Sequence, residues 1–247
     1  MKGTTPLGTR NEREAANWVR GMFGRVAHRY DFANHLLSFN MDRLWRARTV
    51  RRVRHVLEKP DARVLDICCG TGDLLLALAS RSKGRVVLGS DFCHPMLTAA
   101  KDKVTKRSAG AVLFESDALR LPVRDASLDL VTVAFGFRNL ANYESGLREL
   151  LRVLAPGGTA AILEFSQPPN RTFASLYNWY SREILPMIGG AISGSKDAYT
   201  YLPESVRKFP TATDLAADMS RLGFADVRYE YLTGGIVALH LGTRGTS

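Results

Sequence analysis

The chain has 247 residues, 45% of them hydrophobic and 23% charged, with a formal net charge of +10, as expected for a soluble globular protein with one sizeable core. Its apolar runs are broken by charge or glycine well before 18 residues, and its N-terminus has no apolar signal segment, so neither a transmembrane helix nor a secretory signal is expected. Three cysteines do not make a disulfide framework, which favours a reducing, cytoplasmic compartment.

The positive charge is concentrated in residues 1–60, which hold 13 Lys/Arg and 5 Asp/Glu and therefore carry +8 of the net +10. Two helices are predicted in this segment, at 14–37 and 42–57, the second ended by Pro60. A basic helical extension of this kind can bind nucleic acid or an anionic membrane surface, or can be a solvated helix face.

Strands and helices alternate over much of the domain predicted at 61–247. Predicted strands are 62–67, 85–91, 112–118, 128–136 and 159–165, and predicted helices are 73–81, 95–104 and 143–154. This alternation predicts a mostly parallel, doubly wound α/β sheet. A helix at 211–222 and two strands, 226–232 and 236–242, follow. The two-residue turn Gly234-Gly235 predicts that these strands form an antiparallel hairpin at the sheet edge.

Residues 167–210 interrupt the alternation and are rich in Tyr, Trp, Phe, Ile and Leu. We interpret them as a helical cap insertion over the carboxyl ends of the strands, where open α/β sheets bind their ligands. Additional core packing is the alternative explanation for so many aromatic residues.

The stretch "VLDICCGTGD" (64–73) predicts a strand, a tight turn and a helix start. Gly70 and Gly72 let the backbone approach a ligand, and the helix start offers free N–H groups. Asp91, 19 residues beyond Gly72, ends the next strand and can accept hydrogen bonds from ribose hydroxyls. An NAD site would need a small residue where this chain has Leu75.

An acid at Asp66 completes a D-x-x-x-G-x-G pattern that resembles motif I of class I S-adenosylmethionine-dependent methyltransferases. That cofactor carries an ammonium, a carboxylate and a cationic sulfonium, so carboxylates near the loop suit it better than they suit a pyrophosphate. Asp117 and Ala118, after the third strand, complete the predicted cofactor site.

From Phe23 to Thr243 the chain resembles the UbiE/MenG family, the C-methyltransferases of menaquinone and ubiquinone biosynthesis. The segments that carry the resemblance are "FGRVAHRYDFANHLLSFNMDRLWR", "VLDICCGTGD", "AFGFRNL", "RVLAPGG", "LEFSQP", "AYTYLPESV" and "TGGIVALHLG". The resemblance implies a Rossmann-like methyltransferase with a seven-stranded sheet. It also implies that Thr71 lies at the cofactor, that Asp91 binds the ribose, and that Asp117 and Ala118 meet the adenine. Ala134 departs from the serine or asparagine of many members, so a polar side-chain contact is missing there.

The resemblance implies methyl transfer to a ring carbon of a prenylated quinol. Demethylmenaquinol is the favoured substrate, and C-methylation in ubiquinone biosynthesis is the alternative. The carbon becomes nucleophilic when a ring hydroxyl loses its proton, so the site must accept a proton and stabilise an oxyanion. Arg138 and Asn139 are candidates to reach the ring oxygens, and Asp31 is a candidate base or a partner that only orients Arg138.

Aromatic residues are candidates for the wall of the substrate pocket, with aromatic core as the alternative. They are Tyr30, Tyr199 and Tyr201, with Trp179 and Tyr180. No metal is expected, because no His/Cys/Asp cluster has ligand spacing.

The adjacent Cys68 and Cys69 could form only a strained disulfide, and with the distant Cys93 they do not make a zinc pattern. We interpret Cys68 and Cys69 as small residues packed beside the methionine arm of the cofactor, with Cys93 near the same pocket.

A prenylated substrate resides in a membrane, so the arginines of the extension could hold the protein at an anionic leaflet as a peripheral protein. They are Arg20, Arg25, Arg29, Arg43, Arg46, Arg48, Arg51, Arg52 and Arg54. A homodimer is also considered. A nucleic-acid methyltransferase is disfavoured, because the chain has no separate RNA-binding module and no N-P-P-Y-type motif after the fourth strand. The presence of Arg138, Asn139 and Asp31 argues against a non-catalytic cofactor-binding subunit.

Overall fold

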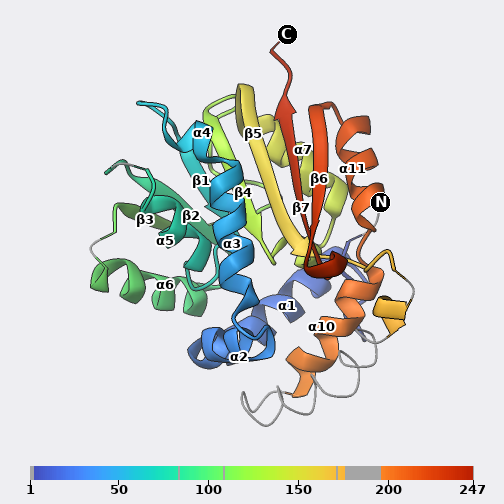
Figure 1. The fold of residues 1–247 in the computed structure, drawn as a ribbon. Coiled ribbons are helices and arrows are strands. Elements are labelled where there is room, and N and C mark those ends of the chain that lie inside the picture. The colour runs from blue at the N-terminus through green and yellow to red at the C-terminus, as the bar shows by residue number, and fades with distance from the viewer. Residues whose placement is uncertain (1–2, 83, 108, 171, 176–195, 247) are drawn as a thin grey trace.

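A seven-stranded sheet with the order β3-β2-β1-β4-β5-β7-β6 forms the centre of the molecule in the computed structural model, which describes residues 3–82, 84–107, 109–170, 172–175 and 196–246 (Figure 1). The strands are β1 (Val64–Ile67), β2 (Val87–Asp91), β3 (Ala111–Glu115), β4 (Leu128–Ala134), β5 (Leu154–Phe165), β6 (Phe224–Leu232) and β7 (Val237–Arg244). β1 to β5 are parallel, and β7 runs antiparallel to both β5 and β6. The predicted fold class is therefore confirmed.

The N-terminal segment forms four short helices and one 3₁₀ turn. They are α1 (Glu12–Val26), η1 (Ala27–Arg29), α2 (Tyr30–Leu37), α3 (Met41–Arg52) and α4 (Arg54–Leu57). The single helix predicted at 14–37 is thus divided at η1. The later helical elements are α5 (Asp73–Ala79), α6 (His94–Lys106), η2 (Phe137–Asn139), α7 (Tyr143–Val153), α10 (Lys196–Lys208), α11 (Ala212–Arg221) and η4 (Thr233–Gly235).

The predicted final hairpin is confirmed, but the prediction that a two-residue turn joins its strands is wrong. Leu232 pairs with Val237, so the connection spans 233–236 and includes η4. Gly234 and Gly235 both have positive φ, and a Cβ on Gly235 would lie 2.5 Å from Pro169 Cδ. The close approach of Pro169 therefore accounts for glycine in this wider turn.

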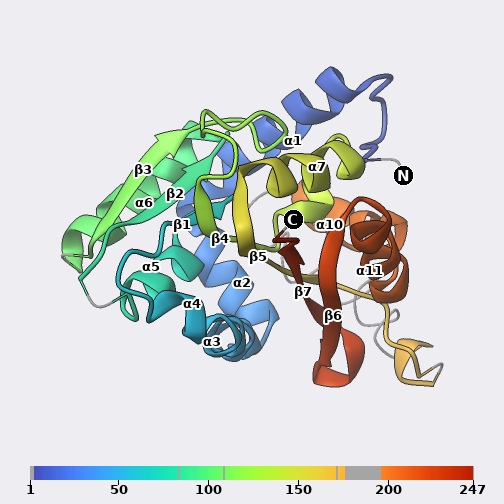
Figure 2. The same cartoon turned by 90° about the horizontal axis from the view of Figure 1, so that it is seen from above.

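Each face of the sheet has its own hydrophobic core (Figure 2). Leu65 and Ile67 of β1 pack in the core that includes α7 and α11, whereas Val64 packs in the core that includes α3, α4 and α5. Burial on both faces explains the continuous apolar character of the central strands. Because α3 and α4 contribute Trp45 and Leu57 to this second core, the basic extension packs directly on the sheet.

Helices α1, α2 and α10 lie beyond the carboxyl edge of the parallel strands (Figure 1). Tyr201 of α10 is buried with Val19 and Met22 of α1, and α10 also contacts η2, which follows β4. The described part of the predicted insertion therefore lies over the strand ends. Trp179 and Tyr180 fall outside the described residues, and the structure describes the backbone of Tyr199 but not its side chain. Within the described ranges, no helix is long and apolar enough to cross a membrane.

Candidate functional site

The loop between β1 and α5 forms one wall of a cavity with an empty volume of about 990 Å³. Gly70 has a φ of 55°, and nothing lies within 4 Å of where its Cβ would be. Gly72 has a φ of 85° and is the N-cap of α5, where a Cβ would meet the Cβ of Ala100 at 3.3 Å. Cys68 also has positive φ without being glycine. The loop is thus bent so that its backbone approaches the cavity.

Asp91, at the end of β2, holds this loop in place. Its carboxylate accepts hydrogen bonds from the backbone N–H of Gly70 (2.8 Å) and of Cys93 (2.9 Å). Burial raises the pKa of Asp91 to about 6, against the backbone hydrogen bonds that favour the ionised form. Two carboxylate oxygens that each accept one such bond still have lone pairs for a ligand hydroxyl.

Asp66 of β1 lines the same cavity but is almost completely buried. Its carboxylate accepts a 2.6 Å hydrogen bond from the hydroxyl of Thr132 on β4. Burial raises the pKa of Asp66 to about 7, although this hydrogen bond opposes the shift. A buried carboxyl poised near neutrality favours a positively charged ligand group beside it.

The far side of the cavity has the mixed polarity that a nucleoside needs. Phe92, Met96 and Leu119 give it apolar walls beside Asp117 and Ala118. The hydroxyl of Ser116, which also lines it, is buried without a hydrogen-bond partner among the described residues. An adenosine, which has polar edges and apolar ring faces, fits this combination of polar groups and apolar walls. Of the predicted cofactor residues, those lining the cavity are Asp66, Gly70, Thr71, Asp91, Asp117 and Ala118; Gly72 instead shapes the turn.

A second cavity, with an empty volume of about 1310 Å³, lies beside the first. Phe23, Tyr30, Arg46 and Phe135 line both, so the two cavities share a wall. The lining of the second cavity is mainly apolar and comes from α1, α2, α3, α10 and the segments that follow the strand ends, and it includes the predicted pocket residues Tyr30 and Tyr201. An apolar chamber that touches a nucleoside cavity suits a hydrophobic second substrate.

Arg138 of η2 places a buried positive charge at the second cavity. Its Nη1 donates to Glu164 at 2.8 Å and to the carbonyl of Phe135 at 2.5 Å, and the ring of Phe165 lies 5.2 Å from its guanidinium carbon. Although burial opposes it, Glu164 raises the pKa of Arg138. Its Nε is buried without a hydrogen-bond partner among the described residues, so this donor is available to an anionic ligand group.

The expected pairing of Asp31 with Arg138 is wrong. Glu164 on β5 takes that place because the end of β5 lies beside the end of β4, and η2, which contains Arg138, follows shortly after β4. Asp31 instead binds the hydroxyl of Thr71 at 2.5 Å and Lys103 Nζ at 2.5 Å. Asp31 is not among the residues that line either cavity, and its role as a base stays a prediction.

Asn139 lies next to Arg138 in η2 but lines the first cavity. Its Nδ2 donates to the carbonyl of Phe135 at 3.3 Å, and its Oδ1 accepts from the hydroxyl of Tyr201 at 3.0 Å. The same Tyr201 hydroxyl is 2.6 Å from the hydroxyl of Thr4. The orientation of Asn139 therefore depends on α10 and on the first residues of the chain.

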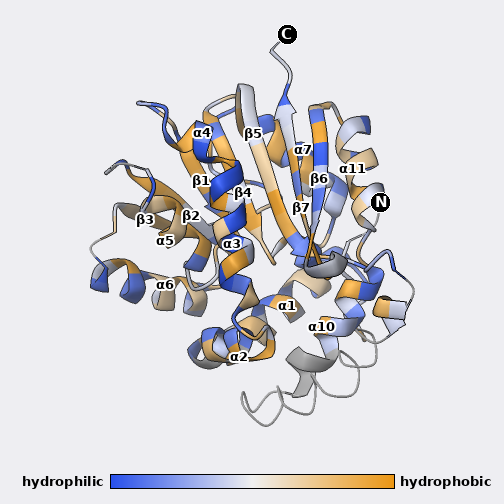
Figure 3. Ribbon diagram, viewed as in Figure 1, coloured by the Kyte–Doolittle hydropathy of each residue, from blue (hydrophilic) through white to orange (hydrophobic). Residues whose placement is uncertain are grey.

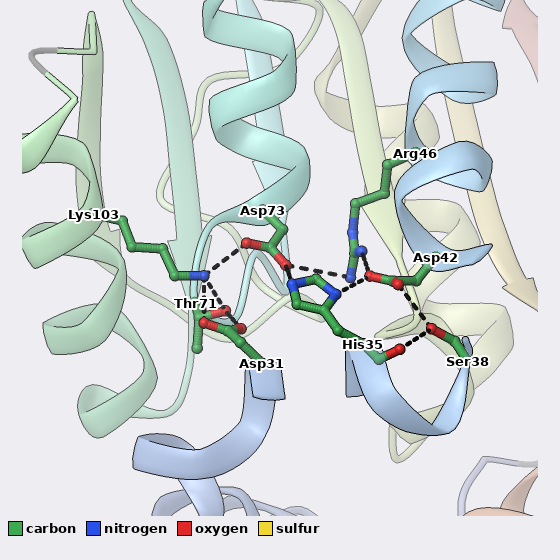
Figure 4. Close-up of polar contacts among 8 residues, drawn as sticks. All are labelled: Asp31, His35, Ser38, Asp42, Arg46, Thr71, Asp73 and Lys103. Carbon is green, nitrogen blue, oxygen red and sulfur yellow. Dashed lines mark hydrogen bonds and ion pairs between the residues drawn. The ribbon is translucent and has the colours of Figure 1, made fainter. Parts of the chain in front are cut away.

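A chain of polar contacts fastens α2 and α3 to the cofactor loop (Figure 4). Lys103 of α6 contacts Thr71 (3.1 Å) and Asp73 (2.7 Å) in addition to Asp31. The next contacts run from Asp73 to His35 Nε2 (3.8 Å) and to Arg46 Nη2 (3.8 Å), and from Asp42 to His35 Nδ1 (2.7 Å), the Ser38 hydroxyl (2.7 Å) and Arg46. We call these eight residues the α2 network.

The two cations of the α2 network help to lower the pKa of two of its carboxyls, Asp42 and Asp73. Although burial opposes the shift, Ser38 and Arg46 lower the pKa of Asp42, and Arg46 and Lys103 lower that of Asp73. Among the described residues, His35, Asp42 and Asp73 have candidate metal-ligand atoms within 4.8 Å of one another. Arg46 pairs with both carboxylates, so positive charge is already supplied where an ion would bind.

The three cysteines are free thiols. Cys68 and Cys69 line the first cavity, as predicted, and burial together with the carboxylates of Asp91 and Asp66 raises the pKa of both thiols. Protonated thiols at neutral pH are poor nucleophiles, which agrees with a space-filling role. Cys93 does not line the cavity and is buried with Val26 and Met96.

Sequence reasoning missed the polar partners at the site. Glu164 lies in "LEFSQP" and Arg46 in "DRLWR", both within the segments that carry the family resemblance. The sequence alone predicts no role for Glu164 and predicts a membrane-surface role for Arg46. The Arg46 side chain is only 13% exposed. Lys103 and Asp73 gave no signal, because their partners come from elements far away in the chain.

Comparison with known proteins identifies the family. The model of the ubiE/COQ5 methyltransferase family matches residues 9–244. A demethylmenaquinone methyltransferase from Thermus thermophilus is 50% identical over 90% of this chain and 100% of its own length, and one from Deinococcus radiodurans is 42% identical over 97% of each chain. A ubiquinone/menaquinone biosynthesis C-methyltransferase UbiE from Geobacter sulfurreducens is 41% identical over 94% of this chain and 90% of its own.

The fold itself also has solved counterparts. The crystal structure of a Thermotoga maritima SAM-dependent methyltransferase, described as a possible histamine N-methyltransferase, superposes with a TM-score of 0.64 at 17% identity, over 92% of this chain and 99% of that one. This likeness supports the sheet architecture alone. The predicted class of enzyme, an S-adenosylmethionine-dependent methyltransferase, is confirmed by the family match and the curated relatives. The chain therefore belongs to the ubiE/COQ5 methyltransferase family.

Proposed function

We propose that this protein transfers a methyl group from S-adenosylmethionine to a ring carbon of demethylmenaquinol, a prenylated quinol. The observation that carries the proposal is the apolar second cavity, which shares a wall with the cofactor cavity and holds the buried guanidinium of Arg138. The names of the Thermus and Deinococcus relatives support the same substrate.

The first cavity would hold the cofactor, with Asp91 accepting from the ribose hydroxyls and Asp117 and Ala118 meeting the adenine. Asp66 and Thr71 would face the methionine end. When bound, S-adenosylmethionine supplies an electrophilic methyl group on a sulfonium. The loop glycines and the acids would fix the position of the cofactor. Methyl transfer then takes place between two bound reactants, which lowers its entropic cost.

Arg138 would bind the ring oxygen that loses its proton. Its charge stabilises the oxyanion and eases the loss of the proton, and Glu164 holds the guanidinium in place. Tyr30 lines both cavities, and burial raises the pKa of its phenol, so it remains a hydrogen-bond donor at neutral pH. Asp42 lines the second cavity, and because Ser38 and Arg46 lower its pKa, it would pass the released proton on to His35, with which it shares a hydrogen bond, rather than keep it.

Methylation assays with purified protein and labelled S-adenosylmethionine test the proposal. Demethylmenaquinol, a ubiquinol precursor and tRNA are supplied separately. We expect label on the demethylmenaquinol ring carbon and none on tRNA. Transfer to the ubiquinol precursor with no transfer to demethylmenaquinol would move the protein to the other quinone pathway, and labelled tRNA alone would overturn the proposal.

A further inference from the structure

Large apolar side chains are exposed at one end of the molecule. Phe32 and Leu36 of α2 are 64% and 45% exposed, Phe39 in the turn after α2 is 76% exposed, and Leu44 of α3 is 61% exposed. Phe32 and Leu36 are four residues apart and therefore share a helix face. We call these four residues the α2 patch. Helix α2 lies at the outer end of the molecule, beyond the carboxyl edge of the sheet (Figure 1).

The α2 patch is continuous with the substrate cavity. Phe39 lines the second cavity together with Leu37 and Met41, although most of its own side chain faces solvent. An apolar surface therefore extends from outside the molecule into the chamber that holds Arg138. Exposed apolar residues that share a helix face, as Phe32 and Leu36 do, mark an interaction site more often than isolated ones do.

The exposed charges described within residues 27–57 have one sign. Residues 27–57, all within the described ranges, contain two acids, Asp31 and Asp42. Both point into the α2 network, where Asp31 binds Lys103 and Asp42 binds Arg46 (Figure 4). Arg43, next to Leu44 in the chain, is exposed. The outward face of this segment is thus apolar and basic, which complements an anionic lipid surface.

Three arginines of α3 are bound to carboxylates and are therefore less available to a membrane surface. Arg48 and Arg52 both bind Glu230 of β6, at 2.7 Å and 2.5 Å, and Arg46 is inside the α2 network. In Figure 3, the ribbon of α3 carries hydrophilic residues between a few hydrophobic ones, and the ribbon of α2 carries both kinds. Apolar contact at α2 is therefore a better basis for attachment to a membrane than the arginines of α3.

We infer that the α2 patch inserts into the interfacial region of an anionic lipid bilayer and brings the mouth of the substrate cavity to the acyl chains. This inference rests on the proposed function, because a prenylated quinol is the substrate that would enter from a bilayer. The patch supplies the apolar contact, and Arg43 supplies electrostatic attraction at its edge.

Vesicle flotation tests the inference with the full chain and vesicles of phosphatidylcholine alone or with phosphatidylglycerol. The test variant is Phe32→Ser/Leu36→Ser, which avoids the cavity lining, and the matched control is Val86→Ser/Val112→Ser, at two valines 52% and 51% exposed near the opposite edge of the sheet. We expect the test variant to bind anionic vesicles at least about tenfold more weakly, and the control to bind like wild type. Arg43→Gln should reduce binding several-fold, and only to anionic vesicles.

Activity separates this inference from the proposed function. The Phe32→Ser/Leu36→Ser variant should methylate a short-chain, water-soluble quinol at the wild-type rate and lose rate only on long-chain quinol in vesicles. Equal flotation of wild type, test variant and control would overturn the inference while short-chain activity still supported the function. A wild-type dimer that this variant disrupts would assign the patch to a second copy and overturn the inference as well.

Discussion

The burial of Asp66 makes the stability of the fold depend on pH. Its folded pKa of about 7 lies above the usual value of 3.8. In the unfolded chain the carboxyl ionises near pH 4, and in the fold only near pH 7. Its contribution to stability is therefore fully present below about pH 4 and is lost as the pH rises to about 7. A bound cation would favour the ionised form and offset that loss.

Replacing Asp66 with asparagine tests this balance. Without cofactor, Asp66→Asn should melt at a higher temperature than wild type at pH 8 and at a similar temperature at pH 4, because the amide avoids a buried charge. Thermal denaturation at the two pH values measures the effect. A lower melting temperature at pH 8 would contradict it.

Proton release on cofactor binding is a separate expectation for Asp66. At pH 7 the carboxyl is about half protonated, so binding of the cationic cofactor should release a fraction of a proton. Calorimetric titrations in buffers of different ionisation enthalpy measure this release. It should disappear in Asp66→Asn, and an unchanged buffer dependence in that variant would show that another group releases the proton.

Glu164 can be tested as the residue that positions Arg138. Glu164→Gln leaves a buried guanidinium without its counter-charge, a change that costs about 3 kcal/mol or more in buried pairs. We expect kcat to fall by about tenfold or more because the guanidinium is no longer held, with KM for S-adenosylmethionine little changed. Glu144→Gln, which removes a surface partner of Arg148, is the control. An unchanged kcat in Glu164→Gln would exclude the positioning role.

At the scale of elements, the position of α2 depends on side chains from four helices. Lys103→Met should leave Asp31 and Asp73 without their shared cation and loosen α2 from the cofactor loop. We expect KM for S-adenosylmethionine to rise by about tenfold, since Thr71 also loses a partner. Lys106→Met, at an exposed position on the same helix, is the control. Equal kinetics for the two variants would show that the α2 network does not support cofactor binding.

The elements themselves were largely readable from the sequence, and their contacts were not. Strand and helix periodicity and the motif "VLDICCGTGD" predicted the sheet, the cofactor loop and the place of Asp91 because these signals are local. The partner of Arg138 depends on which strand lies beside β4, and Lys103 meets Asp31 from 72 positions away in the chain. Such pairings arise from tertiary packing, which no local pattern contains.

For the whole molecule, one hydroxyl links three distant parts of the chain. Tyr201 joins Thr4 at the beginning to Asn139 at the site. Tyr201→Phe should retain the fold, lower the melting temperature by a few degrees, and reduce kcat by up to about tenfold as Asn139 loses its partner. Tyr229→Phe, whose exposed hydroxyl meets Thr213, should change neither quantity. Wild-type turnover in Tyr201→Phe would show that this link is only structural.

The left-handed backbone at Cys68 and Phe135 bears on how this enzyme could be made more heat-resistant. Each non-glycine residue in that conformation costs about 1–2 kcal/mol, and both residues line the cofactor cavity. Cys68→Gly would relieve one cost, and it would also remove the Cβ that lies against Gly136. Engineering for heat tolerance would therefore begin at the loops that line the cofactor cavity, where a change that raises stability is expected to lower the turnover rate.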